Sequence, residues 1–332
     1  MFSWFRRKHK PQPEGFTLAA ARALAPESDA APAATAVPEA AEIHRRYLAR
    51  LFRAAVDADA ALREDEAAWL RQREEELRSK HVSLLEQVPR LPSVMPRLLA
   101  AINDPAKGNA RELAALLESD PVLAANVLGV VNTPALRVRR EPIESLEQAV
   151  VILGFSGMRE VIAAAAISPI VNFNRDRRLD GEVVKGLWSQ SLDVAVAMRT
   201  AARRTASPHG FELYLAGLTH ASGLMALLRG LGSLTAAAPS GAFLSGLESL
   251  SRRYTVAIVR HWGLPEHTAH VLSCRTGGRC SHPEAAMLEQ AVTLMRACVL
   301  GQAGLLDQTQ LAALRQRLPD YAEGWCQGAA HA

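Results

Sequence analysis

The sequence has few aromatic residues, only 5% of its 332 positions, and little regular alternation of β-branched residues. Both kinds of residue are enriched in β-strands, so their scarcity argues against a sheet. Alanine and leucine dominate instead, and both favour helices. Since 49% of the residues are hydrophobic, the chain is able to bury a sizeable core. We therefore predict an all-α protein, a bundle of many helices.

No long block of one charge is present, because 38 basic and 34 acidic residues are mixed along the chain for a net charge of +4. This balance is too weak to predict nucleic-acid binding. A solvated loop explains the one small basic group as well as contacts to phosphates would. That group consists of Arg137, Arg139, Arg140 and Arg159. We therefore expect no nucleic-acid partner.

The four cysteines, Cys274, Cys280, Cys298 and Cys326, form neither a Cys-x-x-Cys pair nor a zinc-type Cys/His pattern. We therefore expect free thiols and a reducing compartment. No apolar run approaches the roughly 20 residues that span a bilayer. The apolar stretch at the N-terminus is too short for the core of a signal peptide. These absences predict a cytoplasmic protein.

Catalytic sequence patterns are missing as well. The sequence has no glycine-rich phosphate loop, no Gly-x-Ser-x-Gly elbow, and no cysteine–histidine pair with local support for a thiol nucleophile. Gly230 and Gly232 only mark the end of a helix. Motifs of this kind therefore predict no enzyme class.

The first 40 residues divide into two parts. Residues 11–40 contain five prolines among alanines and no periodic apolar face, so we predict a disordered linker there. Residues 1–10 form an aromatic and basic peptide, suited to docking on a protein or to peripheral contact with an anionic membrane. The alternative is a disordered start without a binding role. The candidate partner-binding residues are Phe2, Trp4, Phe5, Arg6 and Arg7.

From residue 41 the apolar spacing becomes helical, and we expect a long amphipathic charged helix over residues 41–84. Its later part carries dense charge of both signs around Trp69, Leu70 and Leu77. We interpret this part as a solvated surface with ion pairs between successive turns. A coiled-coil contact is the alternative, although no heptad seam runs through the segment.

The compact body begins with three short helices set off by prolines. A proline-bounded turn at residues 91–96 opens the first helix, which ends at residues 103–105. The second helix is expected over residues 110–119. The third is expected over residues 122–131, with Pro121 in its first turn, where the missing N–H is harmless.

A longer apolar segment follows these helices. Ser145 is expected to cap a helix, with Glu147 and Gln148 in its first turn. The residues 154–157, Gly-Phe-Ser-Gly, should interrupt it. Residues 158–167 are apolar on all sides, which predicts a central buried helix.

Four motifs occur in an order that resembles the HDOD family, the HD-related output domains of bacterial signalling proteins. They are LPSVMP at 91–96, SDPVLA at 119–124, VVNT at 130–133 and IESLEQAVVILG at 143–154. The resemblance covers residues 85–285, with an N-terminal helical half over 85–180 and a degenerate HD-like half over 181–285. C-terminal helices and a tail are expected over residues 286–332.

The resemblance implies a second half built like an HD phosphohydrolase, where a histidine, a His-Asp pair and a later aspartate hold one or two divalent metals. In LWSQSL, residues 187–192, the first histidine position reads Gln190. In LAGLTHASG, residues 215–223, the His-Asp pair reads His220 and Ala221. An amide replaces imidazole poorly, and alanine offers no ligand oxygen. We call these three residues the vestigial positions and expect no bound metal.

Later segments support the same expectation. VRHWGLP at residues 259–265 resembles a further family landmark, but the stretch where paired histidines often follow reads Ser273-Cys274-Arg275. The helix expected to carry the final aspartate, residues 290–300, has no acidic residue. Asp193, one turn beyond Gln190, is the residue that keeps a rebuilt metal site open. His220 is otherwise interpreted as a hydrogen-bonded core histidine.

Five further histidines show no ligand spacing and are interpreted as structural or solvent-facing. They are His209, His261, His267, His270 and His282.

These observations predict a non-catalytic signalling or regulatory protein that needs no cofactor and works by binding other proteins, with a homodimer left open. The alternative is a residual metal-dependent phosphohydrolase acting on a nucleotide or a cyclic-dinucleotide second messenger. The fold, His220 and Asp193 favour the alternative. The missing ligands favour the regulatory protein, because a fold does not carry a function without its site residues.

Overall fold

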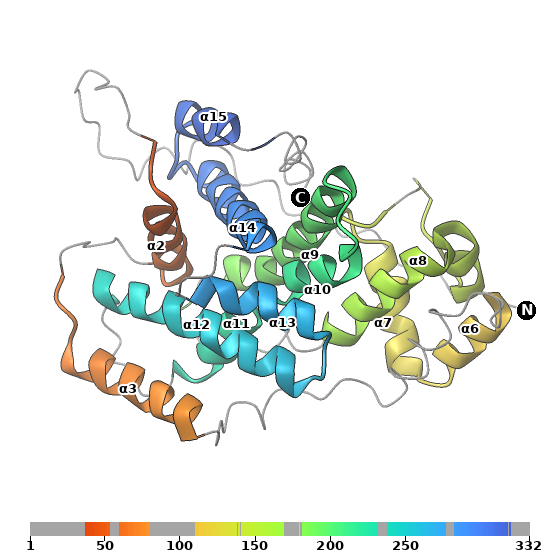
Figure 1. Ribbon diagram of the computed structural model, residues 1–332, viewed down its shortest axis with the longest axis horizontal. Helices are drawn as coiled ribbons and strands as arrows, with labels where there is room; N and C mark the ends of the chain where they lie inside the picture. The colour runs from red at the N-terminus through yellow and green to blue at the C-terminus, as the bar shows by residue number, and fades with distance from the viewer. Residues whose placement is uncertain are drawn as a thin grey trace, which may run out of the picture. The chain divides into compact units, whose positions relative to one another are not determined.

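The regular elements of the described part of the chain are all helices, so the predicted all-α class is confirmed (Figure 1). The N-terminal peptide, residues 1–10, and the first helix of the compact body lie outside the described residues, as does the linker up to residue 36. The computed structural model describes residues 37–53, 60–79, 110–137, 139, 141–168, 179, 181–231, 238–276, 282–317 and 319.

The N-terminal half contains the helices α6 (Ala110–Glu118), α7 (Pro121–Val131) and α8 (Leu146–Ile167). The Asp120 carboxylate caps α7 by accepting hydrogen bonds from the backbone N–H groups of Val122 and Leu123. The Ser145 hydroxyl caps α8 by accepting from the N–H of Gln148 at 3.1 Å. The predicted starts of both helices are therefore confirmed.

Helix α8 is interrupted at Gly154, whose φ of 64° lies in the left-handed region that favours glycine. Beyond this point the residues from Val161 to Ile167 are all buried. They share one apolar cluster with residues of α6 and α7. The expected interruption and the expected buried helix are both confirmed.

The second half is a larger group of helices. Helix α9 packs along α10, and α11 packs along α12 (Figure 1). A Cβ atom at Gly223 would lie only 2.0 Å from the carbonyl oxygen of Ser251, so α11 and α12 touch backbone to backbone. The helices are α9 (Gly181–Arg204), α10 (Gly210–Thr219), α11 (Ser222–Arg229), α12 (Gly241–His261), α13 (Glu266–Ser273), α14 (Pro283–Gln302) and α15 (Gln308–Gln316), with a 3-10 turn at Cys274–Thr276.

The single long helix expected over residues 41–84 is two helices in the structure, α2 (Ala40–Leu51) and α3 (Glu64–Ser79). Helix α2 ends at Leu51 with Phe52 as its C-cap, and Arg53 has a left-handed φ of 53°. The break lets each helix turn its apolar side to the same neighbour. Helix α2 packs against α9, α12 and α14, while α3 packs along α12 (Figure 1).

The solvated surface expected for α3 is also wrong in part. Trp69 is buried, and its indole N–H donates to the carbonyl oxygen of Gly230 at 2.9 Å. Glu66 is fully buried and accepts hydrogen bonds from the backbone N–H and the hydroxyl of Ser240 at 2.8 and 2.7 Å. Because Ser240 also caps α12, α3 is part of the helical body and fixes the start of α12.

Two expectations about composition need correction. Both cysteines in the described part, Cys274 and Cys298, are disulfide-bonded, so the prediction of free thiols is wrong for these two.

Two helical segments, Leu146–Ile167 and Gly210–Arg229, have the length and apolar composition of a membrane span, although no such run was expected. This is weak evidence, because the core helices of other proteins have the same composition. Half of the first segment and 83% of the second are buried among other helices.

Candidate functional site

The vestigial positions lie where α9 meets the junction of α10 and α11. Gln190 lies on α9, and its side-chain oxygen accepts a hydrogen bond from the Tyr47 hydroxyl of α2 at 2.5 Å. His220 and Ala221 occupy the short break between α10 and α11. Ala221 is buried in an apolar cluster. A hydrogen-bonded amide and a buried methyl group therefore stand where the resemblance places metal ligands.

His220 is held in one protonation state. Its Nδ1 lies 2.6 Å from the carbonyl oxygen of Gly217, which can only accept, so Nδ1 carries the proton. Burial, followed by the positive charge of Arg275, lowers the pKa of His220 to about 3. The imidazole is therefore neutral at physiological pH, and its Nε2 keeps a lone pair.

A group of ion pairs fills the region next to His220, and we call it the arginine–glutamate cluster. Glu289 accepts hydrogen bonds from Arg252 and Arg275, both at 2.8 Å, and from His44 Nε2 at 2.7 Å. Glu248 accepts from Arg252 at 3.1 Å and from Arg296 at 2.8 Å. The members of the cluster are Arg252, Arg275, Arg296, Glu248, Glu289 and His44.

The cluster carries a net positive charge, since three guanidinium groups face two carboxylates and His44 is held neutral. Burial and the charge of Arg296 lower the pKa of His44. Burial alone would raise the pKa of Glu248, but the charges of Arg296, His44 and Arg252 and the hydrogen bond from Arg296 together outweigh it and hold that pKa far below the usual range. The charge of Arg275, with the hydrogen bond from His44 and the charge of Arg252, likewise outweighs burial and lowers the pKa of Glu289. Both carboxylates are therefore ionised and fully engaged.

Helix α2 closes this region from one side. His44 pairs with Glu289, and the guanidinium of Arg296 lies 4.9 Å from the centre of the Tyr47 ring. Tyr47 is buried, which raises its pKa to about 12 and keeps it a hydrogen-bond donor to Gln190. Two side chains one turn apart on α2 therefore link Gln190 to the arginine–glutamate cluster.

Asp193 does not join the other candidate positions. Burial raises its pKa to about 6, and no charged group in the described part of the chain contributes to that shift. Asp193 also belongs to no group of three or more potential metal ligands among the described residues.

The histidines that seemed scattered in the sequence are brought together elsewhere. His209, His267, His270 and His282 come from three segments and meet beside the start of α14. His261 stays exposed at the end of α12. Sequence spacing missed this group, because its members are separated by up to 73 residues (209 to 282). The grouping follows only from how α10, α13 and α14 pack.

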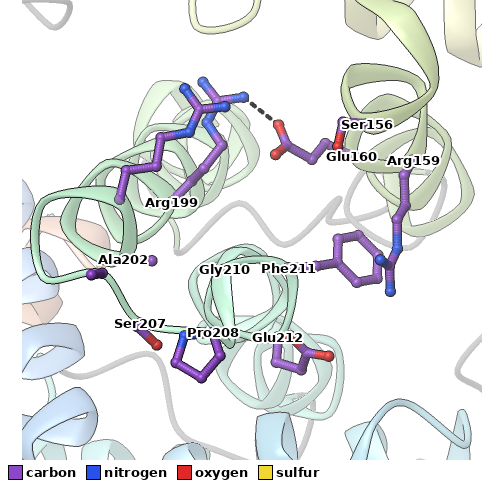
Figure 2. A pocket seen from close by; sticks show the side chains of 12 residues that line it. Ser156, Arg159, Glu160, Arg199, Ala202, Ser207, Pro208, Gly210, Phe211 and Glu212 are labelled. Atoms are coloured by element: carbon purple, nitrogen blue, oxygen red, sulfur yellow. Dashed lines mark hydrogen bonds and ion pairs between the residues drawn. The ribbon is translucent and has the colours of Figure 1, made fainter.

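An open pocket of about 430 Å³ lies between α8, α9 and the start of α10 (Figure 2). The Arg159 guanidinium lies 3.7 Å from the centre of the Phe211 ring, a cation–π contact. Arg199 pairs with Glu160, and Arg203 adds an exposed positive charge. Arg159, expected to belong to a basic loop, thus lines a cavity. The pocket has the polar lining and positive charge that suit an anionic group.

The order and packing of its helices place the chain in the class of all-α proteins with an HD-like second half. A family model for the HDOD domain matches residues 88–276, more than half of the chain. The protein therefore belongs to the HDOD family, as the motifs indicated. Among curated proteins none matches the chain.

Solved structures of several bacterial proteins resemble the fold. A protein of Shewanella amazonensis SB2B, provisionally named a metal-dependent phosphohydrolase, is 19% identical, with a TM-score of 0.51, covering 76% of this chain and 89% of that one. An HDOD domain protein of unknown function from Geobacter sulfurreducens is 23% identical (TM-score 0.47; 69% and 80% covered). A provisionally named signal transduction protein of Marinobacter aquaeolei VT8 is 19% identical (TM-score 0.46; 85% and 65% covered). At these identities the first likeness shows the fold alone.

Proposed function

We propose that this protein is a non-catalytic regulatory member of the HDOD family that acts in the bacterial cytoplasm by binding other proteins. The arginine–glutamate cluster beside His220 is the observation that carries the proposal. A divalent metal needs donor atoms that are neutral or negative and free to turn toward it. Here both nearby carboxylates are taken by arginines.

The charges themselves oppose a metal. Two like unit charges 4 Å apart repel by about 4 kcal/mol at an effective dielectric constant of 20, and a divalent ion doubles this. Arg275 and Arg296 both act on His220, so each of them would repel an ion on its Nε2. Arg296 lies on α14, the helix that was expected to carry the final aspartate. Its guanidinium supplies positive charge in the region where the resemblance places a metal cation.

The pocket of Figure 2 supports a binding role. Arg159 and Arg203 offer positive charge to an acidic side chain or a phosphate group of a partner, and Phe211 offers an aromatic face. The N-terminal peptide with Phe2 and Trp4 remains a second candidate contact, for a protein or for a membrane surface. A homodimer is an alternative way to use the same surfaces.

A residual phosphohydrolase is the second candidate function. The neutral imidazole of His220, protonated on Nδ1, supports it, because a lone pair on Nε2 is what a metal would use. Such an enzyme would act on a nucleotide or a cyclic dinucleotide. For such an enzyme to bind its metal, Glu248 or Glu289 would have to leave its present hydrogen-bond partners, which are the arginines and, for Glu289, also His44.

The two functions are separated by binding of Mn²⁺ and Mg²⁺ to the full chain, measured by calorimetry, together with hydrolysis of cyclic dinucleotides and bis-p-nitrophenyl phosphate. We expect neither binding nor turnover above the level of His220→Asn. A reconstructed variant, Gln190→His with Ala221→Asp and Arg296→Asp, is the positive control and should gain metal. Stoichiometric Mn²⁺ and turnover in the unaltered chain, both lost in His220→Asn, would overturn the regulatory proposal.

The binding role is tested with purified chain in native cell extract. Arg159→Glu should reduce recovery of specific partners, because it reverses the charge over Phe211. Arg139→Glu, on the exposed loop before α8, is the matched control. If both variants recover the same proteins as the unaltered chain, the pocket is not the contact surface.

A further inference from the structure

Four histidines and one glutamate gather at the opposite end of α10 from His220. His209 precedes α10, His267 and His270 lie on α13, and His282 and Glu284 lie at the start of α14. The rings of His209 and His267 are stacked with their centres 3.8 Å apart. The ring of His282 lies 5.7 Å from His267 and 5.2 Å from His270, in both cases edge-on.

The Glu284 carboxylate stands in the middle of this group. Its Oε2 lies 2.6 Å from His267 Nε2 and 3.8 Å from His282 Nδ1. One ligand atom from each of these three residues lies within 4.8 Å of the other two. Ligands of a tetrahedral zinc ion, about 2.0–2.1 Å from the metal, stand about 3.4 Å apart. Shifts of the side chains by about an ångström would therefore bring the three atoms to that spacing.

His282 supplies an independent observation. Its Nδ1 atom is buried and has no hydrogen-bond partner among the residues that the structure describes. A buried polar nitrogen without a partner is costly and calls for an explanation. The atom lies too far from Glu284 Oε2 for a hydrogen bond, but at a distance that an ion between them would bridge.

The surroundings hold the carboxylate in place. The hydroxyl of Ser207 donates to Glu284 Oε1 at 2.7 Å, which leaves Oε2 for the histidines. A partner of this kind, one shell out from the metal, is typical of zinc ligands. Cys274 lies 3.9 Å from His270 Nε2, but it is disulfide-bonded and offers no thiolate.

We propose that His267, His282 and Glu284 form a zinc site, separate from the vestigial positions. Two imidazoles and one carboxylate are a ligand set that suits zinc, whereas Mg²⁺ and Ca²⁺ prefer oxygen ligands. Three protein ligands leave a fourth position for water or for His270. The bound ion ties α13 to α14, and through Ser207 it also reaches the turn between α9 and α10, so its role is structural or regulatory.

The test uses the full chain without a histidine tag, stripped with chelator and reloaded with Zn²⁺ or Co²⁺. We expect one zinc per chain by elemental analysis, and the visible absorption of tetrahedral Co²⁺. His282→Ala should lose both signals. His261→Ala, an exposed histidine outside the group, and His220→Asn should keep them. The last variant separates this site from any metal at the vestigial positions.

Thermal unfolding guards against a variant that simply folds poorly. Since His282 Nδ1 has no hydrogen-bond partner in the described part of the chain, the metal-free His282→Ala protein should melt near the temperature of the metal-free unaltered chain. Zinc should raise the melting temperature of the unaltered chain by several degrees and leave the variant unchanged. The proposal fails if the unaltered chain binds no zinc, or if His282→Ala binds it equally well.

Discussion

The protonation of His220 offers a test that does not depend on any ligand. Its pKa is about 3 in the folded protein, against about 6.5 for an unperturbed histidine. Between these values the unfolded chain takes up a proton that the folded chain does not. The stability that neutral His220 contributes is therefore complete above pH 6.5 and is lost as the pH falls toward 3.

The size of the effect follows from proton linkage. Lowering the pH from 7.5 to 5 should cost about 2 kcal/mol of unfolding free energy through His220 alone. The result is the same for any folded pKa below about 4, because such a histidine is still neutral at pH 5. His44, whose pKa is lowered by burial and by Arg296, adds to the loss in the same direction.

Urea unfolding at pH 7.5 and 5, followed by circular dichroism, measures the difference. In His220→Asn the amide can still donate to the carbonyl oxygen of Gly217, but it does not titrate. The unfolding free energy that His220→Asn loses on acidification should therefore be about 2 kcal/mol smaller than the loss in the unaltered chain. His261→Asn, at the exposed end of α12, controls for the loss of a histidine. Equal pH dependence in the unaltered chain and in His220→Asn would refute the buried neutral imidazole.

Three packing predictions rest on other contacts. Glu66→Ala should lower the unfolding free energy by about 1–3 kcal/mol in urea, since the buried Ser240 N–H loses its acceptor; an unchanged midpoint would contradict this. Gly223→Ala places a Cβ 2.0 Å from a backbone oxygen and should cost about 3 kcal/mol or more, whereas Gly246→Ala meets only the movable end of a leucine side chain. Similar melting temperatures for Gly223→Ala and Gly246→Ala would contradict the tight contact of α11 and α12. Arg296→Met should cost about 3–5 kcal/mol in urea, because Glu248, only 12% exposed, loses one of its two arginine partners, and a cost near zero would show that Arg252 suffices.

The sequence predicted the helices α6, α7 and α8 well because their signals are local. Asp120 and Ser145 cap the helices that follow them, and Gly154 breaks α8 where glycine was expected to do so. Each of these effects depends on residues within a few positions of one another. Such features need no knowledge of the tertiary fold.

Features that depend on distant contacts were missed. The mixed charge of α3 indicated a solvated surface, yet Glu66 is buried because Ser240, far along the chain, supplies its donors. Sequence comparison identified the substitutions at Gln190 and Ala221. It did not indicate that Arg296 and Glu289 from α14 would meet His44 from α2.

The histidine group shows the same limit. His267 and His282 have no zinc-type spacing, and only the contact between α13 and the start of α14 brings them together. One local signal was available: His282 and Glu284 are two residues apart and flank the proline that starts α14. An imidazole and a carboxylate at a rigid helix start are one half of the ligand set that α13 completes with His267.

The contacts of α2, α3 and α14 bear on how the protein can be divided. Residues 88–276, the span of the family match, include Glu248, Arg252 and Arg275. A fragment cut to those limits would lose Glu289 and Arg296, and with them the charges that neutralise one another in the interior. We therefore expect an independently folding unit to be larger than the matched segment and to include α2 and α14.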